Sequence, residues 1–126
     1  MANTTRILIV EDDQFIREFY EELFTQEGYK VETASDGEMA LDKIKQGGWN
    51  IVLLDIMLPK MDGIQILKNL NLKSSSLNIG PIIVLTNLGN NTIINEAFSL
   101  GASGYLIKSA LNPEEVIKEI KNFLSK

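Results

Sequence analysis

Five short segments with strand character alternate along this chain with five segments of helical periodicity, and this alternation restricts the fold more than any other feature. Most of the strand segments are continuous apolar runs, which are typical of parallel strands covered on both faces. They lie at Arg6–Val10, Tyr29–Ala34, Ile51–Leu54, Pro81–Thr86 and Gly104–Ile107. Such alternation predicts an α/β fold with helices on both faces of one parallel sheet.

Each strand segment is followed by a stretch whose apolar residues recur with helical spacing. The second stretch lies between a turn at Asp36–Gly37 and a stop at Gly47–Gly48. The third and fourth cover residues 64–72 and 90–100, and the fourth should be the least stable because it is rich in asparagine. The last begins at Asn112–Pro113, an N-cap followed by proline. The first ends near Gly28, and its predicted buried stripe contains Phe15, Ile16, Phe19, Tyr20, Leu23 and Phe24. Met39 and Phe98 lie on the predicted buried stripes of the second and fourth stretches.

The length of the chain and the unbroken pattern predict a single domain. At 126 residues the chain can bury a sizeable core, and neither a repeat nor a linker interrupts the alternation. We therefore predict one doubly wound domain over residues 1–126, with its core at about residues 6–124 and right-handed crossovers between the strands.

Composition mainly excludes classes of function. The net charge of −5 without a basic cluster argues against direct binding to nucleic acid or to an anionic membrane. Cysteine and histidine are both absent, which excludes disulfides, thiolate metal sites, a histidine-based triad and a phosphohistidine carrier. The N-terminal apolar run is far too short for a signal peptide or a membrane span, so we expect a cytoplasmic protein.

Polar residues that can handle a phosphoryl group follow four of the five strand segments: Glu11–Asp12, Asp55, Thr86 and Lys108. Because the carboxyl ends of parallel strands meet at one edge of the sheet, these side chains should converge there. Asp55 alone would be interpreted as a strand-ending or turn aspartate, but clustered carboxylates repel one another unless a cation neutralises them. An all-oxygen set of ligands favours Mg²⁺. Asp13 is expected to cap the first helix, with Asp12 as the alternative cap, and Asp62 to form a turn.

Four motifs make the chain resemble the response-regulator receiver domains of two-component signalling over nearly its whole length. They are IVEDD, LLDIMLPKMDG, VLT and GASGYLIK, each at the end of a predicted strand. The resemblance implies a flavodoxin-like fold with strand order 2-1-3-4-5 and implies Asp55 as the phosphoacceptor. It also implies a Mg²⁺ site that uses Asp12 directly, Glu11 through water, Asp55, and the backbone carbonyl of Met57.

The same resemblance implies which residues bind the phosphoryl group and which change conformation in response to it. Thr86 and Lys108 would hydrogen-bond its oxygens, and Tyr105 would change rotamer together with Thr86 during switching. The alternative to a switching role is that Tyr105 is a structural residue at the edge of the core. Two departures from the family pattern are Asn87, where a small residue is usual, and Ser109, where proline is usual. Without proline we predict a trans Lys108–Ser109 peptide bond.

The implied function is a phosphorylation-controlled signalling switch and not an enzyme acting on other substrates. The donor would be a sensor histidine kinase or a histidine phosphotransfer protein. The signal would pass to a downstream effector or output domain through the face formed by the fourth helix, fifth strand and fifth helix, and a homodimer formed on phosphorylation is a further option. A stand-alone regulator is favoured, although an excised receiver would have the same sequence.

Three rival functions fit the pattern less well. A phosphohydrolase of the haloacid dehalogenase type needs a second aspartate two residues after the nucleophile, where this chain has Met57. A flavodoxin would need a phosphate-binding loop after the first strand, where Glu11, Asp12 and Asp13 would repel an anion. A receiver-like interaction module that is never phosphorylated is disfavoured by the complete set of acids, Thr86 and Lys108.

Overall fold

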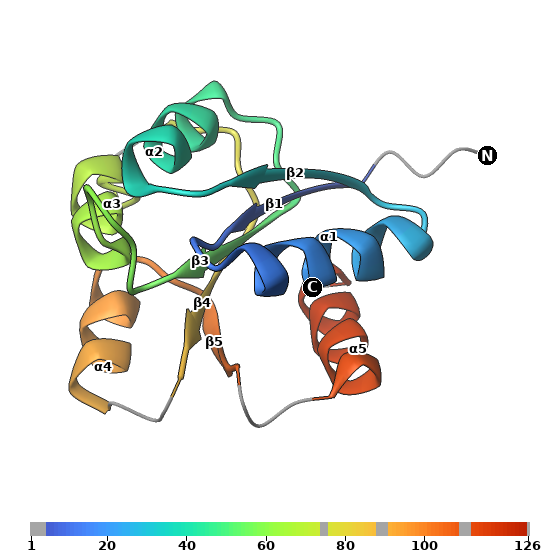
Figure 1. Ribbon diagram of the computed structural model, residues 1–126. Helices are drawn as coiled ribbons and strands as arrows, with labels where there is room; N and C mark the ends of the chain where they lie inside the picture. The colour runs from blue at the N-terminus through green and yellow to red at the C-terminus, as the bar shows by residue number, and fades with distance from the viewer. Residues whose placement is uncertain (1–4, 74–75, 88–90, 109–111, 126) are drawn as a thin grey trace.

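A single five-stranded parallel sheet with helices on both faces forms the protein (Figure 1). The computed structural model describes residues 5–73, 76–87, 91–108 and 112–125. The strands pair in the order β2-β1-β3-β4-β5, as the family resemblance implied. The elements are β1 (Arg6–Val10), α1 (Gln14–Gln26), β2 (Lys30–Ala34), α2 (Gly37–Gln46), β3 (Ile51–Asp55), α3 (Gly63–Leu70), β4 (Ile82–Thr86), α4 (Asn91–Ser99), β5 (Gly104–Ile107) and α5 (Pro113–Leu124).

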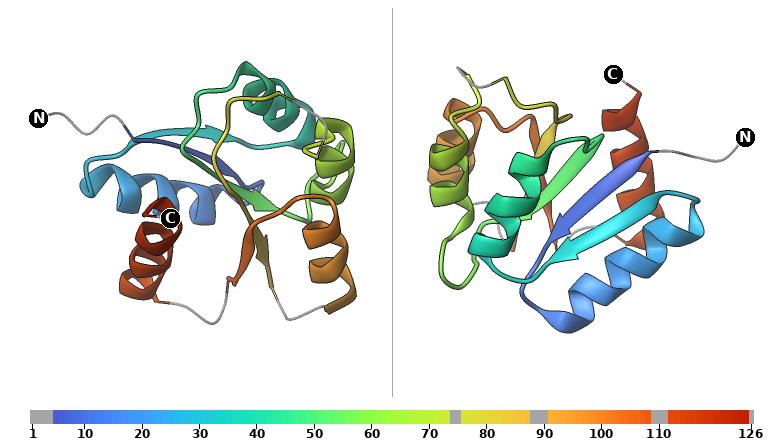
Figure 2. Two further views of the ribbon diagram at one scale, coloured as in Figure 1. Left: turned by 180° about the vertical axis from the view of Figure 1, so that it is seen from behind. Right: turned by 90° about the horizontal axis from the view of Figure 1, so that it is seen from above.

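The strands divide their side chains between two apolar layers because successive residues point to opposite faces. Leu8, Val52 and Leu54 pack with α2, α3 and α4 on one face. Ile7, Ile51 and Leu53 pack with α1 and α5 on the other. Figure 2 shows from two further sides that α1 and α5 lie on one face of the sheet and α2, α3 and α4 on the other. β3 is buried along its full length, as the continuous apolar run predicted.

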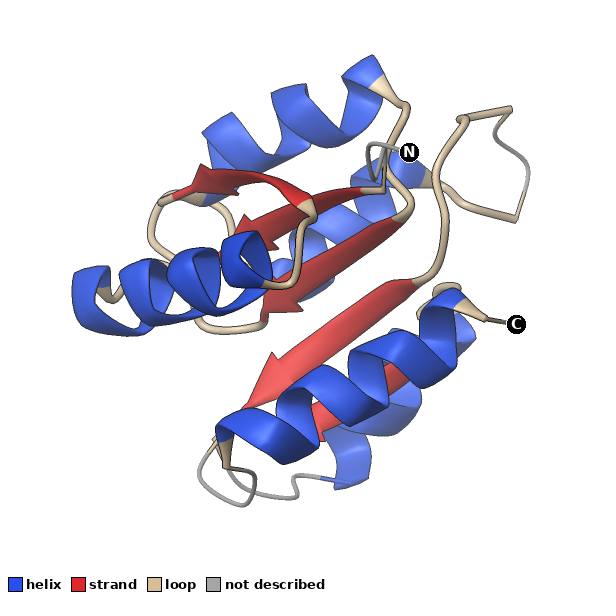
Figure 3. Cartoon of the chain, turned by 90° about the vertical axis from the view of Figure 1, so that its right-hand side faces the viewer, coloured by secondary structure: helices blue, strands red, loops and turns tan. Residues whose placement is uncertain are grey.

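All strands run in the same direction, so their carboxyl ends lie at one edge of the sheet (Figure 3). Three helices that begin near this edge have an aspartate at the N-cap: Asp13, Asp36 and Asp62 each accept a hydrogen bond from a backbone N–H of the first turn. Asp13 is thus the cap of α1, as preferred over Asp12, and Asp62 forms a capping box with Gln65. These short-range bonds fix where the loops at this edge end.

The predicted buried stripes were too wide. Phe15 is 86% exposed and Phe19 46% exposed, so α1 packs on the sheet mainly through Tyr20 and Phe24. Met39 and Phe98 are each 41% exposed and also lie outside the core. Helical periodicity identifies one side of a helix, but the sheet covers only part of that side, which in α1 is the part that carries Tyr20 and Phe24.

At the opposite, amino-terminal edge, Trp49 closes the core. It pairs with Ile79 in an isolated parallel bridge, is 3% exposed, and donates its indole N–H to the carbonyl of Lys43 at 2.8 Å. The guanidinium carbon of Arg6 lies 4.2 Å from its ring centroid.

Among the described residues, none of the helices is both long enough and apolar enough to cross a membrane. The Lys108–Ser109 peptide bond lies outside the described residues.

Candidate functional site

The loop between β1 and α1 carries the first two acids predicted for the site. The side chain of Glu11 is fully buried, whereas Asp12 is exposed. The backbone N–H of Glu11 donates to the carbonyl of Ala34 at 3.0 Å, and the backbone N–H of Asp13 donates to Oε2 of Glu11 at 3.2 Å. The Glu11 carboxylate is therefore fixed beneath the loop, and the chain turns at Asp12 toward solvent.

Asp55 lies at the carboxyl end of the central strand and is 3% exposed. Its Oδ1 accepts a hydrogen bond of 3.1 Å from the backbone N–H of Met57. Its Oδ2 accepts a hydrogen bond of 2.8 Å from the ammonium group of Lys108. The Met57 side chain itself is 71% exposed. Asp55 is thus a buried residue at the carboxyl edge of the sheet, and its Oδ2 points toward Lys108.

Lys108 connects the two buried carboxylates, since its ammonium group also contacts Oε1 of Glu11. Burial would lower the pKa of this lysine, but its hydrogen bonds to Asp55 and Glu11 outweigh that effect and raise it. Burial, with the neighbouring Asp55, raises the pKa of Glu11 to about 7, although Lys108 acts in the opposite direction. One ammonium group therefore does not neutralise the buried acids.

The three acids are close enough to share a cation. One carboxylate oxygen from each of Glu11, Asp12 and Asp55 lies within 4.8 Å of the others. The excess negative charge, the raised pKa of Glu11 and the all-oxygen chemistry fit a hard divalent cation such as Mg²⁺. Two of the oxygens are held by buried side chains, while Asp12 faces solvent, which leaves room for water in the coordination shell.

The remaining predicted residues lie at the ends of β4 and β5. The backbone N–H of Lys108 donates to the carbonyl of Thr86 at 2.8 Å, which joins these two strand ends. Thr86 is partly buried, and Asn87 after it is exposed. Tyr105 is 43% exposed and meets Phe98 of α4 edge to face, with ring centroids 6.3 Å apart.

Arg17 also contributes to this edge of the sheet, and the sequence did not predict its role. Arg17 lies on α1, and its Nη1 donates to the backbone carbonyls of both Glu11 and Asp12, at 3.0 and 3.2 Å. A side chain that bonds only to main-chain oxygens leaves no motif, because the residues it contacts can be of any type. The spacing of six and five residues to these carbonyls was the one available signal, and it is not specific.

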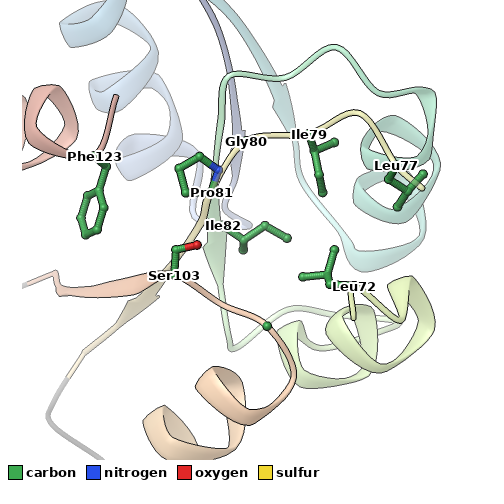
Figure 4. Close-up of a pocket in the computed structure, with 9 residues that line it drawn as sticks. Leu72, Leu77, Ile79, Gly80, Pro81, Ile82, Ser103 and Phe123 are labelled. Atoms are coloured by element: carbon green, nitrogen blue, oxygen red, sulfur yellow. The ribbon is translucent and has the colours of Figure 1, made fainter. Parts of the chain in front are cut away.

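A cavity of about 510 Å³ lies at the opposite edge of the sheet (Figure 4). Leu72, Ile79, Pro81 and Phe123 line it, and none of the predicted site residues does. The candidate site is therefore defined by converging polar groups and not by the size of a cavity.

Comparison with known proteins gives consistent results. The family model described as "Response regulator receiver domain" matches residues 7–121. Transcriptional regulatory protein SrrA of Staphylococcus aureus is 35% identical over 121 residues, which are 96% of this chain and 48% of SrrA. ResD of Bacillus subtilis is 31% identical over 98% of this chain and 49% of its own length. The chain thus spans about half the length of the curated relatives it matches.

Solved structures share the same fold. Chemotaxis protein CheY4 of Vibrio cholerae superposes with a TM-score of 0.83 at 30% sequence identity, and the match covers 96% of this chain and 99% of CheY4.

Proposed function

The chain belongs to the response regulator receiver domain family, and from this premise we propose that it is a signalling switch that accepts a phosphoryl group on Asp55. The observation that carries the proposal is the position of Lys108, whose ammonium group contacts both Asp55 and the buried Glu11. Asp55 is the acid that ends the central strand, and one of its oxygens is already oriented by that lysine.

The transfer needs little covalent chemistry from the protein. An oxygen of Asp55 attacks the phosphorus of a phosphohistidine donor, and the P–N bond breaks. The electron pair of that bond stays on the imidazole nitrogen, which takes up a proton from water. Lys108 offsets negative charge on the transferred group, and the hydroxyl of Thr86 at the end of β4 donates a hydrogen bond to a phosphoryl oxygen.

The proposed metal ligands are Asp12, Asp55 and the carbonyl of Met57, with Glu11 acting through water. When bound, Mg²⁺ would neutralise charge on the acids and on the phosphoryl oxygens. The clustering of three carboxylates, of which Glu11 and Asp55 share one ammonium group, supports this assignment. The exposed Asp12 provides the carboxylate on the solvent side.

The proposed donor is a sensor histidine kinase or a histidine phosphotransfer protein. Phe15 and Met57, both strongly exposed, follow the strand ends that carry the acids and offer apolar contact area to such a partner. The proposed output surface is the α4–β5–α5 face, where Tyr105 and Phe98 contact each other. Because the curated relatives are about twice as long, we propose that an effector or output domain binds this face. We propose that this interaction takes place in the cytoplasm.

Intact-mass measurement after incubation with a small phosphoryl donor and Mg²⁺ tests the proposal. The wild type should gain one phosphoryl group, and Asp55→Asn should gain none. The matched control is Asp42→Asn, which changes an exposed aspartate on α2 and should be phosphorylated like the wild type. Full incorporation in Asp55→Asn would rule out Asp55 as the acceptor, and no incorporation in any form would favour an unphosphorylated interaction module.

A further inference from the structure

The backbone between β1 and α1 contains the two peptide groups that set the direction of the Asp12 side chain. β1 ends at Val10, and the first backbone hydrogen bond of α1 runs from Arg17 N–H to the carbonyl of Asp13. The peptide groups that join Glu11 to Asp12 and Asp12 to Asp13 lie between these elements. Their orientation determines where the Cα–Cβ bond of Asp12 points.

Arg17 holds both of these peptide groups with one nitrogen. Its Nη1 donates to the carbonyls of Glu11 and Asp12, the two groups whose rotation would turn Asp12. The hydrogen bond to Glu11 is partly buried, whereas that to Asp12 is exposed. Since Nη1 belongs to a planar guanidinium group, the two bonds fix a direction as well as a distance.

From this contact we propose that Arg17 is a positioning residue for the metal site: it orients the Asp12 carboxylate toward Asp55 by holding the carbonyls on either side of it. The inference rests on the proposed function, because it assumes that Asp12 is a metal ligand. Arg17 touches neither the metal nor the phosphoryl group and acts only through the loop.

The charge of Arg17 and its hydrogen bonds have opposite effects on cation binding, which makes the proposal testable. The positive charge of Arg17, next to the loop that carries Glu11 and Asp12, repels Mg²⁺, so removing the charge alone would strengthen Mg²⁺ binding. Removing the hydrogen bonds frees the loop and weakens Mg²⁺ binding, because ligands that are not oriented beforehand must be ordered by the metal. A purely structural role would alter stability and leave Mg²⁺ affinity unchanged.

The experiment is a titration with MgCl₂ alone, followed by ¹H–¹⁵N NMR of the folded protein, with the Mg²⁺ dissociation constant as the readout. Arg17→Met removes the charge and the donors and should weaken binding roughly 10-fold, at the lower end of the range for residues that orient metal ligands. Arg17→Lys keeps the charge but lacks the planar fork that holds both carbonyls, so it should also bind Mg²⁺ more weakly than the wild type. Lys30→Met removes an exposed positive charge from β2 and should bind as the wild type does.

Binding by Arg17→Met that equals or exceeds wild-type binding would overturn the positioning role. If that variant does not fold, Arg17→Lys decides, since a dissociation constant equal to the wild-type value would also overturn it. These results differ from a failure of the proposed function, in which the wild type itself would not bind Mg²⁺.

Discussion

Lys108 and Asp55 form a 2.8 Å hydrogen bond between strands that are not neighbours in the sheet. Asp55 ends β3 and Lys108 follows β5, while β4 lies between them. Adjacent strands are about 4.8 Å apart, so the Lys108 side chain, the hydrogen bond and the Asp55 side chain together span about two such spacings across the end of β4. A group bound to Asp55 would therefore lie beside Thr86, the last residue of β4.

The incomplete neutralisation of Glu11 predicts a pH dependence of stability in the absence of divalent cations. Its pKa rises from an ordinary value of 4.5 to about 7 on folding, so between these values the folded state binds more protons than the unfolded state. Stability should then fall as the pH rises through this window. At about 1.4 kcal/mol per pKa unit, the loss attributable to Glu11 is at most about 3.5 kcal/mol.

Urea unfolding at pH 5 and pH 8 in the presence of a chelator measures this effect. The decrease in the free energy of unfolding should be smaller in Glu11→Gln than in the wild type. Equal decreases in the two proteins would show that Glu11 is not the group that titrates.

Mg²⁺ should stabilise the wild type, because a ligand that binds only the folded state adds RT ln(1 + [L]/Kd) to the free energy of unfolding. A concentration about 100-fold above Kd contributes about 2.7 kcal/mol. Asp12→Ala should lose most of this gain, and Asp42→Ala, which changes an exposed acid on α2, should retain it. The measurement is thermal unfolding with and without MgCl₂, and an equal rise in Tm for Asp12→Ala and wild type would exclude Asp12 as a ligand.

Asn87 should slow the reaction with small donors, because it is larger than the small residue usual at this position and follows Thr86 at the site. It is exposed, so Asn87→Ala should change stability little. We expect faster phosphorylation by a small donor in this variant. Asn122→Ala, on the exposed side of α5, is the control for loss of an asparagine, and equal rates in both variants would show that the Asn87 amide does not restrict access.

Gly37 permits a close approach between α2 and the loop after β3. A Cβ at this position would overlap the carbonyl oxygen of Met61, and the Gly37 N–H donates to the carbonyl of Pro59 at 3.2 Å. Gly37→Ala should therefore cost about 1–3 kcal/mol, as overpacking against backbone typically does. Exposed Glu38 is the control, since Glu38→Ala should stay within about 0.5 kcal/mol of wild type in chemical denaturation. An equally small change in the free energy of unfolding of Gly37→Ala would mean that the loop after β3 can move away from the added Cβ at little cost.

The sequence predicted the strands better than the helix faces, and the reason lies in the range of the interactions. The bounds of β1 and β5 agree with the predicted Arg6–Val10 and Gly104–Ile107, because a short apolar run followed by a polar residue defines both ends. Phe15 and Phe19 were predicted to be buried and are not, since the area covered by the sheet depends on how the elements pack.

The convergence of Glu11, Asp12, Asp55 and Lys108 followed from the topology, and the carboxylate oxygens do cluster. Two features of the site were not predictable from residue types. The contact of one lysine with both buried acids depends on side-chain reach, and the bonds of Arg17 run to main-chain oxygens, which every residue has.

The position of the buried Trp49 determines which processes intrinsic tryptophan fluorescence can report in this protein. It is the only tryptophan in the chain and lies at the amino end of β3, whereas Asp55 lies at the carboxyl end. Six residues of extended chain separate the two by about 20 Å. Its fluorescence should therefore change strongly on unfolding, when the indole leaves the Arg6 guanidinium and the Lys43 carbonyl, and little on cation binding at the acids. Intrinsic emission is thus suited to measuring stability, while ligand binding at the far edge needs a signal from that edge, such as its backbone amide resonances.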